Sequence, residues 1–452
     1  MTLPDGRIHI VGAGGAGMSA IARLLIGQGH TLSGSDLRGG AALDALADLA
    51  VDVHIGHHPE MVPGAALVMA SSAVPDYDEE LAAAREEGIP VWRRPQVLAA
   101  ITAGTPTIGA TGTHGKTTTT AMLVTILREL GEDPSFIVGG DLVDLATNGH
   151  LGASQLLVLE ADEAFRTFES LHLDGLVITN VEHEHVDHFG SAGELVDSFI
   201  GVARRVDGPV VACGDDPGAR LVADEVDAIT YGFTEPVGWR LGDFSTSAGG
   251  VRFTLDRDGR SARVALSQPG RHLALDAAGA VALCVELGHD LDAAAAGVAA
   301  FRGVGRRWEH KGTVAGVVLY DDYAHHPTEV RAVLEAAADT ATGRIWAVFQ
   351  PHLYSRTERF SQEFGEALAV ADVVVVTDVF GAREEPVPGV TGELVAEAVR
   401  DAGGDVHYVA RRYEIADFLA PKVRSGDLVI SLGAGDITLL HTELAPMLGV
   451  RR

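Results

Sequence analysis

The chain has 452 residues and a formal net charge of −29 at pH 7. Its length predicts about three domains, and its acidity argues against nucleic acid and anionic membrane as partners. The two cysteines, Cys213 and Cys284, form no CxxC pair, which favours buried thiols in a reducing compartment. The N-terminus lacks the pattern of a signal peptide, and no apolar run is long enough to span a bilayer. We therefore expect a cytoplasmic protein.

The first motif follows a strand predicted over residues 7–11. Gly12, Gly14 and Gly17 have the G-x-G-x-x-G spacing, a helical pattern follows, and the next strand ends at Asp36. This βαβ start is typical of a dinucleotide site, with the acidic residue placed for a ribose. The spacing fits NAD and equally any ligand with a diphosphate and a sugar, and a tight turn without a ligand stays an alternative. A further strand, over 66–70, ends in Ser71 and Ser72.

A second glycine-bearing turn lies within residues 107–130, between a predicted strand and a predicted helix. Gly112 and Gly115 allow the turn, Lys116 can reach the outer phosphates of a nucleotide, and the Thr117 hydroxyl can ligate Mg²⁺. The helical pattern consists of Leu123, Ile126, Leu127 and Leu130, and Gly131 is placed to end it. Ala110 stands where the strict motif has glycine. A Thr-rich helix start that binds nothing is the alternative.

The middle of the chain repeats short apolar strands that run directly into polar residues. One such strand leads to Glu160, and another leads to a segment with His183, His185 and His188. Ligands collect at the carboxyl ends of parallel strands, so Glu160 and His185 are candidates for the same cleft as Lys116. The H-E-H-V-D-H spacing after a strand differs from H-E-x-x-H on a helix, which argues against zinc.

The same arrangement returns after residue 308. Predicted strands over 317–320, 345–349, 373–376 and 428–432 lead into polar residues, with a helix over 329–338. Strands that alternate with helices predict a third α/β domain. We therefore predict the α/β fold class with three domains: a Rossmann-like domain (1–104), a central P-loop ATPase-type domain (105–308) and a C-terminal Rossmann-like domain (309–452).

The motifs IHIVGAGGAGMSAIARLL, ATGTHGKTTTT, LEADE, TNVEHEHVDHFGS, FRGVGRRW, DDYAHHPTEV, FQPHLYSRT and SLGAGDI together resemble the Mur ligase family over nearly the whole chain. The resemblance implies an ATP-dependent amide ligase of peptidoglycan precursor synthesis. Such an enzyme joins L-alanine to the lactyl carboxylate of UDP-N-acetylmuramate through an acyl phosphate. Its first domain holds the UDP-sugar, its second ATP and its third the amino acid. The resemblance further implies a cytoplasmic monomer or weak homodimer that uses ATP and Mg²⁺.

The resemblance also assigns roles to individual residues. It implies catalytic roles for Lys116, Glu160, His185, Arg307 and Asp322. The implied metal ligands are Thr117, Glu160 and His185. The implied ATP-binding residues are Gly112, Thr113, Gly115, Lys116, Thr117, Thr118, His272, Arg307 and Asp322. The implied UDP-sugar-binding residues are Gly12, Gly14, Gly15, Gly17, Asp36, Ser71, Ser72 and His114. The implied amino-acid-binding residues are His326 and Arg356.

Some positions depart from the family pattern. Leu273 and Asp276 replace two asparagines near the adenine, residues 164–168 replace a run of small residues, and Leu353 replaces an arginine. We expect a weaker grip on the carboxylate of the amino acid or of the muramyl substrate, because Arg356 alone remains. Alternatively, Leu353 simply packs and a neighbour such as Arg359 or Arg383 supplies the charge.

Three other functions stay open. A divergent paralogue would join another amino acid or a peptide to a UDP-sugar acid. An NAD-dependent oxidoreductase would leave Lys116 and Thr117 unexplained. A nucleotide-sensing binding protein without turnover is disfavoured because Lys116, Glu160, His185 and Asp322 are all present.

Overall fold

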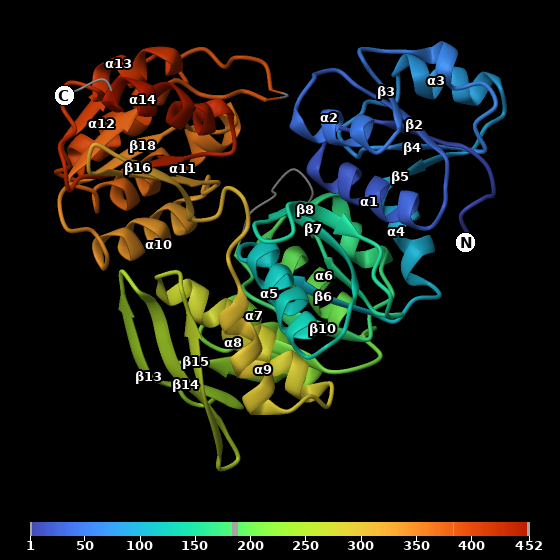
Figure 1. Ribbon diagram of the computed structural model, residues 1–452, viewed down its shortest axis with the longest axis horizontal. Coiled ribbons are helices and arrows are strands. Elements are labelled where there is room, and N and C mark those ends of the chain that lie inside the picture. Colours follow the sequence, from blue (N-terminus) through green and yellow to red (C-terminus); the bar gives the residue numbers. More distant parts are fainter. Residues whose placement is uncertain (1, 183–188, 383, 450–452) are drawn as a thin grey trace. The chain divides into compact units, whose positions relative to one another are not determined.

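The computed structural model describes residues 2–182, 189–382 and 384–449 (Figure 1). The chain forms two compact units. The first comprises residues 1–244, 253–265 and 275–302, and the second comprises residues 245–252, 266–274 and 303–452. The described residues contain three β-sheets, in agreement with the α/β class predicted above. The domain boundaries at 104/105 and 308/309 stay predictions.

The first sheet is parallel and lies in the first unit. Its strands are β1 (Ile8–Val11), β2 (Leu32–Asp36), β3 (Asp52–Ile55), β4 (Leu67–Ala70) and β5 (Val91–Arg93). Their order is β3-β2-β1-β4-β5. The helices are α1 (Ala16–Gly27), α2 (Ala41–Asp48), η1 (Pro59–Met61), α3 (Glu79–Glu86) and α4 (Arg94–Thr102). Every residue of β1 and β4 is buried, as expected for central strands of a parallel sheet that is covered on both faces.

The second sheet carries the P-loop. Its strands are β6 (Thr107–Thr111), β7 (Ser135–Leu142), β8 (Thr147–His150), β9 (Leu157–Glu160), β10 (Gly175–Ile178), β11 (Val210–Cys213), β12 (Ile229–Gly232), β13 (Trp239–Ser247), β14 (Gly250–Arg257) and β15 (Arg260–Leu266). The order is β15-β14-β13-β12-β11-β10-β6-β9-β7-β8. The helices are α5 (Lys116–Glu129), η2 (Ala164–Ser170), α6 (Ala192–Ala203), α7 (Pro217–Val226), α8 (Arg271–Glu286), α9 (Leu291–Gly297) and η3 (Val298–Ala300).

The strand order of this sheet decides which side chains can meet. β6 lies between β9 and β10 and is parallel to both, so the carboxyl ends of these three strands are neighbours. The P-loop, Glu160 and the residues after β10 therefore share one edge of the sheet. Within the first unit, α1 packs against β7 and β8.

The third sheet lies in the second unit. Its strands are β16 (Glu309–Val314), β17 (Val317–Asp322), β18 (Ile345–Phe349), β19 (Val373–Val376), β20 (Val406–Tyr408) and β21 (Leu428–Leu432). The order is β16-β17-β21-β18-β19-β20, and β16 is antiparallel to β17. The helices are α10 (Pro327–Ala338), α11 (Tyr354–Leu368), α12 (Gly392–Asp401), η4 (Arg412–Glu414), α13 (Ile415–Leu419), η5 (Asp436–Leu439) and α14 (Leu440–Gly449).

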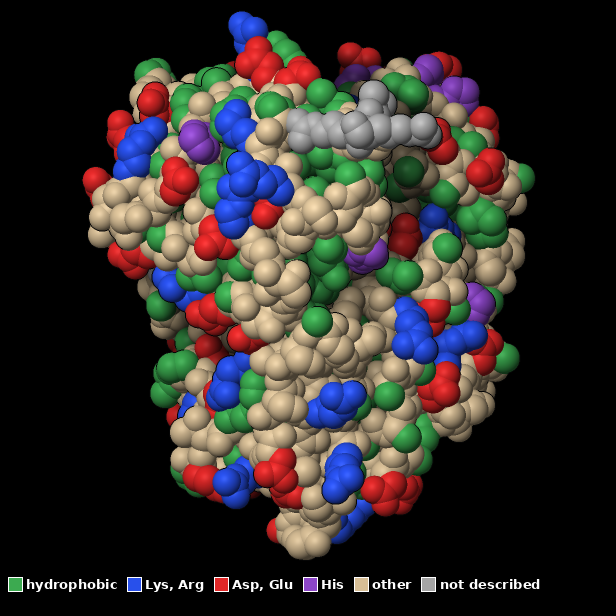
Figure 2. Space-filling view, turned by 60° about the vertical axis from the view of Figure 1, so that its left-hand side comes forward, with side chains coloured by type: hydrophobic (Ala, Val, Ile, Leu, Met, Phe, Trp, Pro, Cys, Tyr) green, Lys and Arg blue, Asp and Glu red, His purple; other side chains and the backbone are tan. Residues whose placement is uncertain are grey.

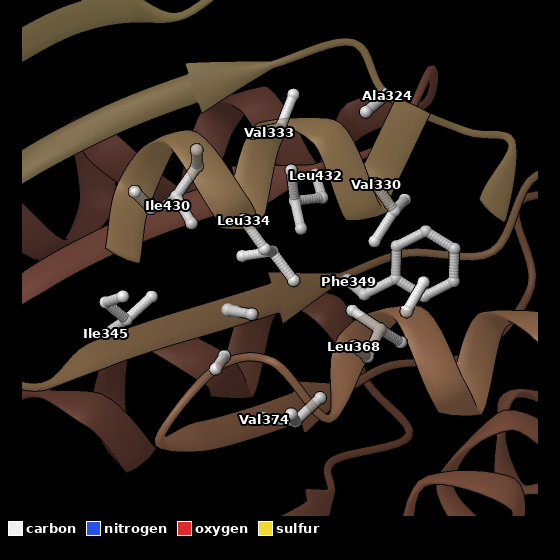
Figure 3. Packing of buried hydrophobic residues seen from close by; sticks show 14 of the residues in the cluster. Ala324, Val330, Val333, Leu334, Ile345, Phe349, Leu368, Val374, Ile430 and Leu432 are labelled. Carbon is white, nitrogen blue, oxygen red and sulfur yellow. The ribbon is translucent and has the colours of Figure 1, made fainter. Parts of the chain in front are cut away.

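Two hydrophobic clusters cover the two faces of this sheet. On one face, Leu334 of α10 and Leu368 of α11 pack near Phe349 and Ile430 (Figure 3). On the other face, residues of α13 and α14 pack against the same strands through side chains such as Val348. Burial on both faces explains why β18 and β21 are almost continuously apolar in sequence.

Most predicted strands match the structure within one or two residues. The predictions over 345–349, 373–376 and 428–432 coincide with β18, β19 and β21. Gly131 follows the end of α5 with φ +87°, which confirms its predicted role as the residue that ends the helix. Strands β3, β5, β7, β8, β12 to β16 and β20 were not predicted. Among the described residues, no helix is both long and apolar enough to cross a membrane. On the face presented in Figure 2, acidic and basic side chains are interspersed.

Candidate active site

The P-loop is a tight turn that two glycines permit. Gly112 has φ +136°, and Gly115, the N-cap of α5, has φ +81°. A Cβ at position 112 would lie 2.1 Å from the Thr179 hydroxyl oxygen, and one at 115 would lie 2.6 Å from the Asp276 carboxylate. Side chains therefore fit at neither position. The turn aims the N-terminus of α5, which begins at Lys116, at the carboxyl edge of the sheet.

Residues after β10 hold the loop in place. The His114 backbone N–H donates to Asn180 Oδ1 (2.8 Å), and the Thr179 hydroxyl donates to the His114 carbonyl (2.5 Å). The Glu182 backbone N–H donates to the Thr113 hydroxyl (2.9 Å). His114, which the resemblance assigns to the UDP-sugar, is thus part of the P-loop, and its contact with a sugar stays a prediction.

Lys116 folds back onto this loop. Its Nζ donates to the carbonyls of Gly112 (2.6 Å) and Thr113 (3.1 Å) and to Glu163 Oε1 (2.9 Å). Burial acts to lower the pKa of Lys116, but the carboxylates of Glu163 and Asp162 outweigh it, so the pKa is raised. Lys116 is therefore a largely buried cation at the start of α5, whose charged form its carboxylate neighbours favour, as suits an anion site. Glu163, its carboxylate partner, was not among the residues predicted to act in the site.

Glu160 and Thr117 converge beside Gly139. Glu160 Oε1 accepts a hydrogen bond from the Gly139 N–H (2.6 Å), and a Cβ at 139 would lie 2.8 Å from both Glu160 oxygens and 3.1 Å from the Thr117 hydroxyl. Burial raises the pKa of Glu160, although hydrogen bonds from Gly139 and Thr117 act to lower it. A carboxylate and a hydroxyl are hard oxygen donors of the kind that suits Mg²⁺.

The third predicted metal ligand, His185, lies outside the described residues. So do His183 and His188, on which the zinc alternative rested, and Arg383. The side chain of Thr118, a further predicted nucleotide contact, is buried in the first turn of α5.

The glycine turn of the first sheet brings most of the predicted UDP-sugar residues together. Gly12 has φ +81°, and a Cβ there would lie 3.0 Å from the Ser71 Cβ at the end of β4. The Gly14 N–H donates to Asp36 Oδ2 (2.9 Å), and Gly15 is the N-cap of α1. Ser71 follows β4 directly, and Ser72 is the next residue. The Asp36 carboxylate thus supports the turn itself, and its contact with a ribose stays a prediction.

In the second unit, Asp322 ends β17 as a buried carboxyl. Its oxygens accept hydrogen bonds from the backbone N–H groups of Trp308 (2.7 Å) and Ala324 (2.8 Å). Burial raises the pKa of Asp322 to about 6, although Arg307 acts to lower it. The Arg307 guanidinium lies over the Tyr323 ring, 4.8 Å from its centroid. Arg307 and Asp322, predicted from widely separated motifs, therefore lie in one cluster.

Asp322 should make the stability of the chain pH-dependent. Because its folded-state pKa is near 6 and its ordinary value is 3.8, its contribution is fully present below about pH 4 and is lost as the pH rises through about 6. The loss should be on the order of 2–3 kcal/mol. Thermal unfolding of wild type and Asp322→Asn across this range should show that the fall is absent in the variant. Asp401→Asn, at an exposed position of the same unit, is the matched control. Parallel pH profiles for wild type and Asp322→Asn would contradict this assignment.

Arg306 and Asp321, the residues directly before Arg307 and Asp322, have a structural role that was not predicted from the sequence. Arg306 Nη2 donates to the carbonyls of Gly433 (2.7 Å) and Gly435 (3.1 Å), and its Nε lies 3.4 Å from Asp321 Oδ2. Asp321 is fully buried and also accepts from Thr438 (2.6 Å). The adjacent Arg-Arg and Asp-Asp pairs were the available indication that these two segments lie together: Arg306 pairs with Asp321, and Arg307 acts on Asp322 through its charge.

The predicted amino-acid-binding residues lie on two neighbouring turns of the second unit. The backbone N–H of His326, the N-cap of α10, donates to Glu329 Oε2 (3.3 Å). Arg356 Nη1 lies 3.3 Å from His352 Nδ1. The rings of His325 and His352 meet edge to face at 5.9 Å, which brings the two turns together. His325, His326, His352 and Arg356 therefore lie on adjacent turns, and contact of His326 and Arg356 with an amino acid stays a prediction.

Leu353 is buried and His272 is partly buried, both in the second unit. Leu353 is 6% exposed and has φ +70°, and its backbone N–H donates to the Phe380 carbonyl (3.0 Å). Leu353 therefore packs in the core, as one of the two alternatives above states. The effect of its replacing an arginine on substrate affinity stays a prediction. Burial lowers the pKa of His272 to about 4, so this predicted ATP contact is a neutral imidazole near pH 7.

Three family models match consecutive parts of the chain. They are described as "Mur ligase family, catalytic domain" (residues 7–105), "Mur ligase middle domain" (110–284) and "Mur ligase, glutamate ligase domain" (306–435). A UDP-N-acetylmuramate–L-alanine ligase from Clavibacter michiganensis is 45% identical, with 96% of this chain and 91% of the relative covered. A protein of the same name from Mycolicibacterium vanbaalenii is 44% identical, covering 97% and 95%. The crystal structure of a UDP-N-acetylmuramate–alanine ligase from Thermotoga maritima superimposes with a TM-score of 0.86 at 28% identity, covering 97% and 98%.

Proposed function

Because the chain belongs to the Mur ligase family, we propose that it is the ATP-dependent ligase that joins L-alanine to the lactyl carboxylate of UDP-N-acetylmuramate. The relatives that carry this name cover nearly the whole chain at 43–45% identity. The observation that supports the proposal most directly is the convergence of Lys116, Glu160 and Thr117 at one strand edge. This places the reaction in peptidoglycan precursor synthesis, and we propose the cytoplasm as its compartment.

The proposed chemistry has two steps. The lactyl carboxylate attacks the γ-phosphorus of ATP, the bond to the bridging oxygen of ADP breaks, and an acyl phosphate forms. The amine of L-alanine then attacks the acyl carbon, phosphate leaves, and the amine loses a proton. Lys116 neutralises charge on the transferring phosphoryl group, which is the main contribution that a protein makes to such a transfer. Arg307 and Asp322 are proposed to contact the nucleotide, and His326 and Arg356 the amino acid.

Glu160, Thr117 and His185 are the residues proposed to hold Mg²⁺. The described donors of this set, a carboxylate and a hydroxyl next to the P-loop, fit the ion by their chemistry. When bound, the ion supplies positive charge to the phosphate oxygens. Glu160 is pre-oriented for this task by the Gly139 N–H.

The proposed function is tested by measuring phosphate release with ATP, UDP-N-acetylmuramate and each amino acid in turn. We expect release with L-alanine that requires all three substrates together. Preferred turnover of another amino acid or of a peptide would identify a divergent paralogue. ATP binding without release in any mixture would identify a nucleotide-sensing protein.

Metal dependence gives a second prediction. We expect activity to require Mg²⁺ or Mn²⁺ and to survive a zinc-selective chelator, because carboxylate, hydroxyl and phosphate oxygens suit hard cations. The measurement is phosphate release after metal removal and after stepwise return of each ion. Stoichiometric zinc in the purified protein, lost together with activity, would contradict the assignment of Glu160 and Thr117.

A further inference from the structure

Arg94 lies against the glycine turn of the first sheet. It is the first residue of α4 and directly follows β5, at the carboxyl edge of that sheet. A Cβ at Gly17 would lie 3.0 Å from Arg94 Cζ, 3.1 Å from Nε and 3.2 Å from Nη2. The guanidinium therefore rests on the backbone of Gly17. A side chain at the third glycine of the G-x-G-x-x-G spacing would push the Arg94 guanidinium aside by a few tenths of an ångström.

The same guanidinium reaches the edge of the second sheet. Arg94 Nη1 donates to Asp162 Oδ2 at 3.1 Å, and the two side chains are only 19% and 21% exposed. Asp162 stands two residues after Glu160 at the end of β9, and its other oxygen accepts from the Ala164 N–H (3.2 Å). Within the first unit, Arg94 thus lies between the glycine turn and the segment that carries Glu160.

The Nε donor of this guanidinium is not satisfied. Arg94 Nε is buried and has no hydrogen-bond partner among the residues that the structure describes. A buried N–H without an acceptor is costly, and a guanidinium is shaped to contact an oxyanion through two adjacent donors. An anionic ligand at the glycine turn would satisfy this N–H while Asp162 continues to hold Nη1.

We propose that Arg94 binds an oxyanion of the UDP-sugar acid, and that Asp162 is a positioning residue that orients Arg94. The inference rests on the proposed function, because it takes UDP-N-acetylmuramate as the ligand. That ligand offers two oxyanions, the diphosphate and the lactyl carboxylate. Because Arg94 also binds Asp162, its contact with either oxyanion would link binding of the UDP-sugar at the glycine turn to the segment that carries Glu160.

A purely structural role is the alternative, and the chain provides a matched control for it. Arg23 on α1 also links the two sheets of the first unit, through Asn148 of β8 and Asp141 of β7. It differs from Arg94 in that the structure records no contact between its described side chain and a glycine of the turn. Arg23→Gln therefore reports what the loss of a linking arginine alone does.

The test compares Arg94→Gln, Arg94→Lys and Arg23→Gln with the wild type. We expect Arg94→Gln to raise the KM and the calorimetric Kd for UDP-N-acetylmuramate about ten- to a hundredfold, with the KM for ATP close to wild type. Arg94→Lys should recover part of the loss, because it keeps the charge but not the fork. Arg23→Gln should lower the melting temperature without changing the ratio of the two KM values. Asp162→Asn should raise the same KM as Arg94→Gln, by a smaller factor.

A second ligand identifies the oxyanion. UDP-N-acetylglucosamine has the diphosphate but lacks the lactyl carboxylate. Equal losses for both sugar nucleotides in Arg94→Gln would assign the contact to the diphosphate, and a loss for the muramate alone would assign it to the carboxylate. Unchanged binding of both by a folded Arg94→Gln, or equal rises in the KM for ATP and for the sugar, would overturn the proposal. A wild-type chain that binds the sugar nucleotide without turning it over would instead refute the proposed function.

Discussion

Replacing Lys116 with alanine is expected to abolish turnover. The Lys116 ammonium lies at the start of α5, bonded to the P-loop carbonyls of Gly112 and Thr113, and it is the group proposed to contact the phosphates of a nucleotide. Loss of such a group commonly removes several kcal/mol of transition-state stabilisation, on the order of a thousandfold in rate. The measurement is phosphate release under saturating substrates, with the extent of folding followed by circular dichroism.

The structure adds a complication that requires a second variant. Lys116 is the partner of Glu163, whose side chain is 1% exposed. Removal of one member of a buried ion pair costs about 3–5 kcal/mol, because the other charge is left uncompensated. Lys116→Ala can therefore lose activity by unfolding. The double variant Lys116→Ala with Glu163→Gln removes the stranded charge and should recover stability without recovering turnover. Phosphate release near the wild-type rate in a folded single or double variant would refute the role of Lys116.

The edge of the second sheet could largely be predicted from sequence. Apolar strands that end in polar residues indicated that Glu160 and Lys116 share an edge, because the carboxyl ends of neighbouring parallel strands meet there. The sequence could not indicate which carboxylate of the LEADE segment faces which cation. Glu160 lies beside Thr117, Asp162 pairs with Arg94, and Glu163 pairs with Lys116. The chain leaves the strand after Glu160, so the alternation of side chains along a strand no longer gives their directions.

The second unit shows a similar limit. The strands that are buried on both faces were predicted to the residue, because a continuous apolar run between polar residues leaves little choice of boundaries. Strands β13 to β15 of the second sheet were missed because their buried apolar residues alternate with more exposed ones and form no continuous apolar run. From the sequence, Leu353 stood out only because it replaces an arginine of the family pattern. Its burial and positive φ depend on packing between α11 and the turn at Phe380, which no local pattern encodes.

Gly112→Ala is expected to be the most destabilising single substitution in the P-loop. The backbone at 112 has φ +136°, and the new methyl group would lie 2.1 Å from the Thr179 hydroxyl and 2.8 Å from the Asn180 carbonyl. Backbone strain and overpacking together should cost about 3–5 kcal/mol. Denaturant unfolding measures this loss. Turnover at temperatures where the variant is folded should also fall, because Thr179 and Asn180 bind His114 within the loop.

Gly131→Ala separates the two causes. Gly131 also has a positive φ (+87°), but no atom outside its immediate neighbours lies within 4 Å of a Cβ built there. Its substitution should cost only about 1–2 kcal/mol, from backbone strain alone, with turnover unaffected. Adding Thr179→Ala to Gly112→Ala removes the nearest clashing atom, so the double variant should lose less than the sum of the two single losses. Equal losses for Gly112→Ala and Gly131→Ala, or strict additivity with Thr179→Ala, would show that contact with the end of β10 does not require glycine at position 112.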